Sequence, residues 1–148
     1  MQFTFKKGIK QSVNSPYFSS TDFDCHCSRP DCTITVVDPT LVDALSDLWK
    51  VCGPFKINSG FRCQAHNAEC GGQKKSFHLI GKASDIQSLK GYMGNALSRY
   101  AETVHSFGSG GIGVATNWIH VDVRGYQARW TYPIAQHLAI EFGDVYDL

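Results

Sequence analysis

The most constraining feature of this sequence is the ten-residue stretch Ser-Phe-His-Leu-Ile-Gly-Lys-Ala-Ser-Asp at positions 76–85. It places His78 and Asp85 seven positions apart, with Gly81 and other small residues between them. Small side chains let a loop fold back closely, so the imidazole and the carboxylate can share one ion. A further histidine, His120, lies downstream. Two imidazoles and one carboxylate are a common ligand set for a catalytic zinc that keeps its fourth position for water. The sequence therefore predicts a zinc hydrolase with these three residues as metal ligands.

The segment around His120 predicts a short strand, Ile119 to Val123. Side chains alternate between the two faces of a strand, so His120 and Asp122 are expected on one face, about 6.7 Å apart along it. The valines on either side of Asp122 then face apolar packing. A carboxylate beside a metal can move a proton from water to the leaving amine, so Asp122 is predicted to be a catalytic residue. The alternative is that Asp122 orients a ligand histidine or binds a nearby arginine.

Arg62 is the second predicted catalytic residue, because it follows a predicted strand at 55–59. An arginine in such a place can bind a substrate carboxylate or stabilise the oxyanion that forms at the scissile carbonyl. A structural salt bridge is the alternative. Arg124 and Arg129 are weaker candidates, closer to ordinary surface charges. Three aromatic residues either line a groove or lie in the core, and the core is favoured for them: Phe61, Trp118 and Trp130.

The chain contains six cysteines, three of them within eight positions of each other. Cys25, Cys27 and Cys32 could supply three thiolates to a second, structural zinc, with Cys63 or Cys70 as the fourth. The Cys-x-Cys-x4-Cys spacing is not a common zinc pattern, however. Disulfides and unpaired thiols therefore remain alternatives, and two zinc ions per chain would support the cluster site.

Apolar periodicity predicts helices and short strands that do not alternate in strict βα order. A helix is expected to begin at Pro39, capped by Asp38, and to end at Gly53. Further elements are predicted as helices at 64–70 and 92–105 and strands at 55–59, 83–87, 112–115 and 119–123. This order favours an α+β fold with a small, mainly antiparallel central sheet flanked by helices. Residues 1–148 are expected to form a single domain, with an irregular, cysteine-containing segment at 1–35 packed on it.

Composition excludes several classes of protein. The net charge of +1 and the lack of a basic stripe give no case for nucleic-acid binding. No apolar run reaches the roughly 18 residues of a membrane span. The first twelve residues lack a continuous apolar stretch, so a secretory signal is not expected. The chain is expected to be a monomer made in the cytoplasm.

These motifs resemble those of the M15-type zinc D-Ala-D-Ala peptidases, in the wider group that includes lysostaphin-type enzymes and the hedgehog signalling domain. The family pattern Ser-x-His-x-x-Gly-x-Ala-x-Asp is matched in full at 76–85. The resemblance spans about residues 17–130, and its opening is similar to the branch of murein endopeptidases and phage lysins. It implies the fold of that group, with His78, Asp85 and His120 as zinc ligands and Arg62 as a substrate or transition-state contact. Further matching blocks are Tyr17-Phe18, Asp22-Phe23, Cys25, Ser59–Arg62, Asn67, Gly71-Gly72, Gly111–Gly113 and Ile119–Asp122.

The resemblance also implies a substrate, an amide bond in the stem peptides of peptidoglycan. The expected activity is that of a D,D-carboxypeptidase or an L,D- or D,D-endopeptidase, in a phage lysin or virion-associated enzyme that reaches the cell wall after release. A cytoplasmic dipeptidase acting on wall precursors is the next enzyme option. Several members carry an acidic residue or histidine three positions before the last zinc ligand, where this chain has Asn117. Either Asp122 does that work, or the chain is an inactive, zinc-stabilised wall-binding or structural protein on the same fold.

Overall fold

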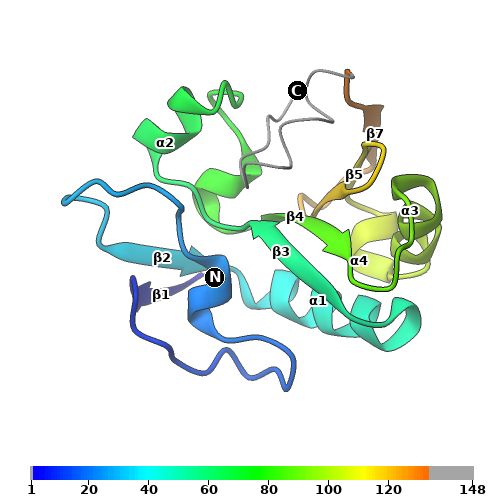
Figure 1. The fold of residues 1–148 in the computed structure, drawn as a ribbon, viewed down its shortest axis with the longest axis horizontal. Coiled ribbons are helices and arrows are strands. Elements are labelled where there is room, and N and C mark those ends of the chain that lie inside the picture. Colours follow the sequence, from blue (N-terminus) through cyan, green and yellow to red (C-terminus); the bar gives the residue numbers. More distant parts are fainter. Residues whose placement is uncertain (1, 134–148) are drawn as a thin grey trace.

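A five-stranded sheet forms the centre of the computed structural model, which describes residues 2–133 (Figure 1). The strand order is β3-β4-β6-β5-β7. Every neighbouring pair is antiparallel except β5 and β7, which run parallel. The predicted α+β class with a mainly antiparallel sheet is therefore confirmed. The strands are β3 (Phe55–Ser59), β4 (Ala83–Ser88), β5 (Gly111–Val114), β6 (Ile119–Asp122) and β7 (Ala128–Thr131).

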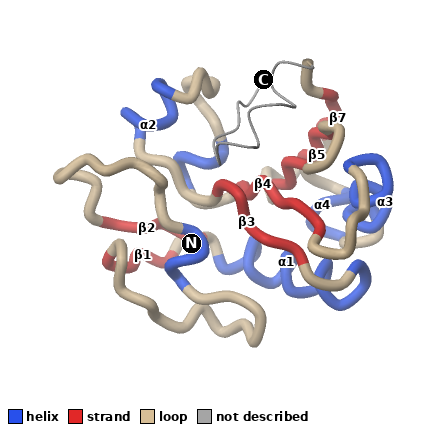
Figure 2. The backbone as a smooth tube through the Cα atoms, in the orientation of Figure 1, coloured by secondary structure: helices blue, strands red, loops and turns tan. Residues whose placement is uncertain are grey.

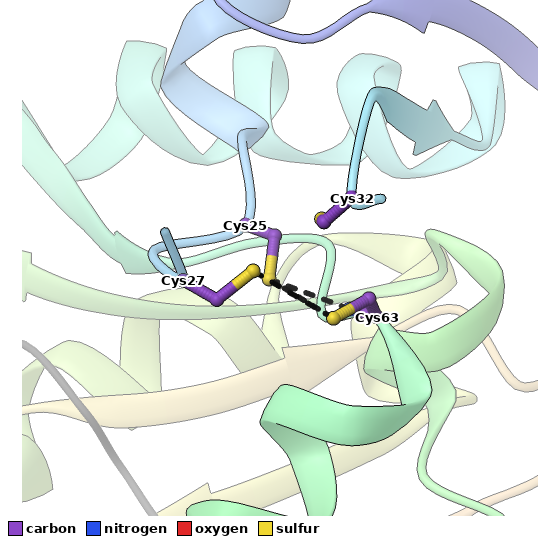
Figure 3. Close-up of side chains that lie close together, drawn as sticks. All are labelled: Cys25, Cys27, Cys32 and Cys63. Atoms are coloured by element: carbon purple, nitrogen blue, oxygen red, sulfur yellow. Dashed lines mark hydrogen bonds between the residues drawn. The ribbon is translucent and has the colours of Figure 1, made fainter. Parts of the chain in front are cut away.

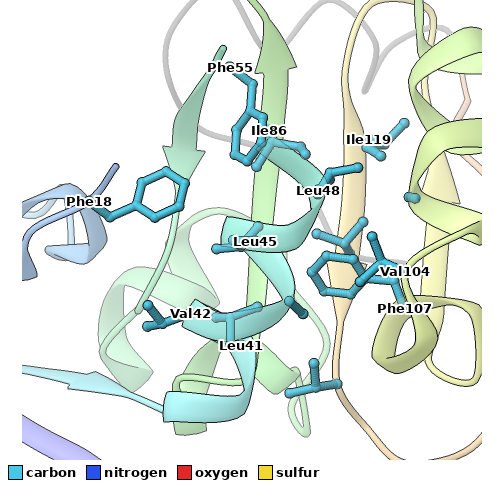
Figure 4. Close-up of a cluster of buried hydrophobic side chains, with 14 of the residues drawn as sticks. Phe18, Leu41, Val42, Leu45, Leu48, Phe55, Ile86, Val104, Phe107 and Ile119 are labelled. Atoms are coloured by element: carbon cyan, nitrogen blue, oxygen red, sulfur yellow. The ribbon is translucent and has the colours of Figure 1, made fainter. Parts of the chain in front are cut away.

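Three helices, α1 (Pro39–Cys52), α3 (Gly94–Glu102) and α4 (His105–Gly108), share one hydrophobic core with a single face of this sheet. Figure 4 shows the α1 leucines lying among side chains of β4 and β6. Val121 and Val123 belong to this core, as strand alternation predicted. Burial of apolar side chains on this side leaves the opposite face of the sheet for polar residues.

Helix α1 begins and ends where the sequence predicted. The Asp38 side chain accepts a hydrogen bond from the Thr40 backbone N–H at 2.8 Å, and Pro39 occupies the first turn. Gly53 ends the helix with a φ of 80°. The Asp38 backbone N–H also donates to the Gly81 carbonyl at 2.9 Å, so the start of α1 is fixed to the loop that carries His78.

The N-terminal part is more regular than predicted. Strand β1 (Phe3–Lys6) pairs antiparallel with β2 (Ile34–Val37), and a 3-10 helix, η1 (Ser20–Phe23), lies between them in sequence. The expectation of an irregular segment at 1–35 is therefore wrong for these elements, although loops make up the rest, as Figure 2 shows. Both strands have only four residues and are surrounded by loop-forming residues, so their short alternation was not recognised.

Other differences concern short elements. The helix predicted at 92–105 is divided into α3 and α4, and β7 was not predicted. The helices α2 (Gln64–Glu69) and η2 (Phe77–Ile80) precede strand β4. Within residues 2–133, no helix combines the length and apolar character needed to cross a bilayer. The single-domain prediction for 1–148 extends beyond the described residues and stays a prediction.

Candidate metal centre

The polar face of the sheet carries one row of paired residues that crosses all five strands. Ser59 pairs with Asp85, Asp85 with His120, His120 with Gly113, and Gly113 with Trp130. Paired residues of neighbouring strands point to the same face, so Asp85 and His120 lie side by side. A Cβ atom on Gly113 would lie 2.4 Å from Nε1 of Trp130. Glycine at this position therefore lets the Trp130 indole pack against His120, and the centroids of these two rings are 5.0 Å apart.

His78 reaches this row from the loop that precedes β4. It lies on the single turn η2, where the Ser76 hydroxyl accepts a hydrogen bond from the His78 backbone N–H at 3.2 Å. Gly81 ends the turn with a φ of 71°, and a Cβ there would lie 2.3 Å from the Val36 carbonyl oxygen. The predicted need for a small residue at Gly81 thus has a double cause, because both the backbone conformation and the close approach of β2 require it.

Each histidine has its outer nitrogen held by a hydrogen-bond acceptor. His78 Nδ1 lies 2.7 Å from the Gly60 carbonyl oxygen, which can only accept, so Nδ1 carries the proton. His120 Nε2 lies 2.7 Å from Oδ2 of Asp122 and is a donor for the same reason. The other ring nitrogens, His78 Nε2 and His120 Nδ1, each lie 3.2 Å from a carboxylate oxygen of Asp85. Metal-binding histidines in proteins show this arrangement, with the distal N–H fixed by an acceptor.

Asp85 is fully buried between the two rings. Among the described residues, neither of its carboxylate oxygens accepts a hydrogen bond of normal geometry. Burial alone would raise the pKa of Asp85, but the rings of His78 and His120, in their charged, protonated form, hold that pKa below its usual range. A buried carboxylate beside two acceptor nitrogens has the Arg62 guanidinium 3.9 Å away as its nearest positive charge, and two protons or one divalent cation would supply the rest. One potential ligand atom from each residue lies within 4.8 Å of the other two, so the three groups fit a shared ion.

Asp122 is fully buried on the far side of His120. Its Oδ1 accepts hydrogen bonds from the Gly111 N–H at 3.0 Å and from Arg124 Nε at 2.8 Å, and Arg124 Nη2 donates to Oδ2 at 2.6 Å. Burial alone would raise the pKa of Asp122, but the hydrogen bonds from Arg124 and His120 outweigh it and keep that pKa well below its ordinary value. These contacts favour the second role expected for Asp122, which is to orient a histidine and bind an arginine.

Arg124 and Arg129 were both expected to be ordinary surface charges, and the structure confirms this for one of them. Arg129 pairs with Glu102 at the surface, as expected of an ordinary charge, with 2.6 Å between Nη2 and Oε1. Arg124 is not such a charge, because its side chain is only 15% exposed and binds Asp122.

Arg62 is buried, and its Nη2 lies 3.9 Å from Oδ2 of Asp85. Its guanidinium is therefore close to the candidate centre, and its predicted contact with substrate stays a prediction.

A pocket of about 300 Å³ is lined by neighbours of the candidate centre, although none of His78, Asp85 and His120 lines it. It is lined by Phe77, next to His78, and by Trp130, whose ring packs on His120. The Arg124 guanidinium lies over the Phe77 ring at 4.6 Å and near the Trp130 ring at 5.1 Å. The core prediction is confirmed for Phe61 and Trp118, which are buried, whereas the half-buried Trp130 lines the pocket. For Trp130 the favoured core prediction is therefore wrong and the groove alternative fits, whereas no sequence pattern identified Phe77 as a wall residue.

A second group of potential ligands lies away from this sheet face. The four thiols of Cys25, Cys27, Cys32 and Cys63 lie within 4.8 Å of one another (Figure 3). Cys70 is not part of the group, and its Sγ lies 3.4 Å from Nε2 of His66. Between the two expected partners of the first three cysteines, the structure therefore selects Cys63. None of the six cysteines forms a disulfide.

The Peptidase M15 family model matches residues 16–122 of this chain. The matched region runs from just before η1 to the end of β6, so it contains every residue of the candidate centre. No curated protein and no solved structure matches the chain.

Proposed function

This chain belongs to the peptidase M15 family, and from that membership we propose that it is a zinc metallopeptidase that hydrolyses an amide bond in the stem peptides of peptidoglycan. The observation that carries the proposal is the pair of imidazoles around Asp85. Both rings have the outer N–H bound to an acceptor, and both turn the second nitrogen toward the same buried carboxylate. A pair of histidines kept only for packing would not need two fixed tautomers, Nδ1–H in His78 and Nε2–H in His120, that each turn the other ring nitrogen toward one anion.

His78, Asp85 and His120 would hold the zinc through Nε2, a carboxylate oxygen and Nδ1, respectively. When bound, zinc supplies Lewis acidity, which activates water and polarises the scissile carbonyl. Three protein ligands would leave one position of a four-coordinate zinc for water, so this set would suit catalysis rather than a closed structural site. Side chains around that position would stabilise the developing charge and orient the ligands.

Arg62 is proposed to stabilise the negative charge that develops on the substrate carbonyl oxygen. Its guanidinium lies beside Asp85 and is shielded from solvent, where an electrostatic interaction is stronger than in water. Asp122 is proposed to contribute through His120, since it fixes which ring nitrogen carries the proton. The earlier prediction that Asp122 is itself the base is tested separately below.

The peptide is proposed to enter by the pocket between Phe77 and Trp130. Aromatic walls bury the apolar parts of a short peptide, and Lys75, which also lines the pocket, offers positive charge to a carboxylate of the stem. Such a pocket suits a carboxypeptidase and an endopeptidase equally well. The proposed setting, a phage lysin or virion-associated enzyme, rests on the resemblance of the opening motifs.

Digestion of purified sacculi tests the proposal. Wild-type protein with zinc is expected to release peptides with new amine termini, identified by mass spectrometry, and a chelator should stop the release. The variant His78→Ala should be inactive, because it removes one proposed ligand. The matched control His105→Ala, an exposed histidine of α4, should keep the wild-type rate. Intact sacculi at full zinc occupancy would contradict the proposed activity.

A second candidate is a catalytically inactive, zinc-stabilised wall-binding or structural protein. The observation that favours it is the absence of a carboxylate at Asn117, combined with the engagement of Asp122 by Arg124. In that case the protein should co-sediment with sacculi and bind zinc without releasing any peptide. Release of product that depends on His78 would exclude this candidate.

A further inference from the structure

The four-cysteine group is a feature that the proposed peptidase chemistry does not use. Its members come from separate parts of the chain: Cys25 and Cys27 follow η1, Cys32 precedes β2, and Cys63 caps the start of α2 (Figure 3). We propose that these thiols form a second metal site, which binds a structural zinc. This proposal does not depend on catalysis at the first centre.

The sulfur geometry matches that of an all-thiolate zinc site. Cys63 Sγ lies 3.8 Å from Sγ of Cys25 and 3.8 Å from Sγ of Cys27. A tetrahedron with zinc–sulfur bonds of about 2.3 Å has edges of about 3.8 Å. The sulfur of Cys32 completes the group within 4.8 Å. Bonded sulfurs in a disulfide would instead be about 2.05 Å apart, so this arrangement is the one expected around an ion.

Hydrogen-bond donors surround the thiols in the way that thiolates require. The backbone N–H of Cys63 points to Cys25 Sγ at 3.4 Å, and that of His66 points to Cys63 Sγ at 3.4 Å. The Lys7 ammonium lies 3.5 Å from Cys32 Sγ and 3.7 Å from Cys27 Sγ. Zinc bound by four thiolates carries a net charge of about −2, which a nearby ammonium group partly offsets.

A zinc ion at this site would stabilise the surrounding loop, and a neighbouring cavity would give the ion access. Residues 24–33 form no helix or strand, and a closed zinc site stabilises a loop that lacks its own core. A cavity of about 490 Å³, lined in part by Cys32 and Cys63, opens beside the thiols and would admit the ion. Four ligands from the protein fill the coordination shell, so the site would be structural rather than catalytic.

The proposed site shares a short backbone segment with the candidate metal centre. Cys63 directly follows Arg62, whose N–H donates to the His78 carbonyl at 3.2 Å. Within the same segment, the Phe61 N–H donates to the Phe23 carbonyl at 2.9 Å, close to Cys25. A zinc ion would thus tie the loop after η1 to the segment that carries Arg62.

Zinc content and X-ray absorption of the full chain test the proposal. Elemental analysis of His78→Ala, which lacks one ligand of the first centre, should find one zinc per chain. Its absorption spectrum should show a shell of sulfur atoms only, at about 2.3 Å. If that variant does not fold, the wild-type spectrum must still contain this sulfur shell. A wild-type spectrum with only nitrogen and oxygen neighbours would overturn the proposal, as would an intact mass that shows disulfides.

Two variants, each with one cysteine replaced, supply the matched comparison. Cys32→Ser should lose one zinc per chain and unfold at a lower temperature than wild type. Cys52→Ala removes a buried cysteine of α1 outside the group and should keep the wild-type zinc content. Equal zinc content in Cys32→Ser and wild type would overturn the assignment. If sulfur-bound zinc is found but sacculi stay intact, the structural site stands and the proposed peptidase function fails.

Discussion

The two groups of potential metal ligands differ in how the fold supports them. His78, Asp85 and His120 are fully buried on the polar face of the sheet, and two of them belong to paired strands. The cysteine group lies between loops and the first turn of α2, and three of its four members are partly exposed. The first group depends on a scaffold that would persist without an ion. The second group has little else to hold it, so an ion there would contribute mainly to stability.

The surroundings of the two groups differ as well. Around the first group, Gly60 and Asp122 fix the histidine rings, and Arg62 and Trp130 lie close by. Around the second, the donors are backbone N–H groups and one lysine. Oriented side chains beside an incomplete ligand set suit chemistry on a substrate, whereas a complete set of thiols suits a permanent cross-link. Selective variants can therefore separate a catalytic ion from a structural one.

The largest expected effect is that of Asp85→Asn. An amide cannot supply the negative charge that two neutral imidazoles need in order to bind zinc tightly, so hydrolysis of sacculi should fall to background. Elemental analysis should show the loss of one zinc, with the sulfur-bound zinc retained. Asp47→Asn, at an exposed position of α1, is the control and should match wild type. Loss of both ions in Asp85→Asn would show that the two sites are not independent.

Arg62→Lys should have the next largest effect. Lysine keeps the charge but loses the planar fork, and removal of an oxyanion contact costs about 10²–10³ in kcat. Zinc content should not change, because Arg62 is not a proposed ligand. Steady-state kinetics on a synthetic stem peptide measure the loss, and Arg99→Lys, an exposed residue of α3, is the control. Wild-type kcat in Arg62→Lys would leave the arginine only a structural role.

Asp122→Asn separates the two roles considered for this carboxylate. In wild type, one carboxylate oxygen accepts hydrogen bonds from Gly111 and Arg124, and the other accepts from His120. Asparagine has a single oxygen, so it cannot accept all of these hydrogen bonds. If Asp122 positions His120, zinc affinity at the first centre should fall about 10- to 100-fold. Competition titrations with a zinc indicator measure this, and the sulfur-bound ion should be unaffected. Unchanged zinc affinity with lost turnover would instead identify Asp122 as the base.

A last pair of variants, at two glycines, is expected to change stability and to leave the ligands themselves in place. Gly81 and Gly91 both have positive φ, but only at Gly81 would a Cβ meet backbone, the Val36 carbonyl at 2.3 Å. Gly91→Ala should lose about 1–2 kcal/mol of stability from the backbone conformation alone. Gly81→Ala should lose about 1–3 kcal/mol more, from steric overlap with β2. Urea unfolding measures the difference, and equal losses would show that the loop of His78 does not depend on this close packing.

Much of this architecture was predictable because it depends on local patterns. The Asp38–Pro39 start and Gly53 end of α1 were identified from capping chemistry, and alternation placed His120 and Asp122 on one face. The predicted membership in the M15 family is confirmed by the family match. The two-strand sheet at the N-terminus and β7 were missed because each of these strands has only four residues and lies outside the motifs that carry the candidate ligands. The equally short β5 and β6 were predicted, since they adjoin the motif of His120.

The sequence by itself determined which residues have metal-binding chemistry, since ligand type and spacing are properties of the chain. Only the tertiary structure decided how they are used. Pairing of β4 with β6 placed His120 beside Asp85, and the turn η2 brought His78 to the same carboxylate. Arg124 paired with the carboxylate of Asp122. Long-range packing of the loop after η1 against the start of α2 selected Cys63 over Cys70. Contacts between residues far apart in sequence depend on the packing of the whole fold, which no local pattern records.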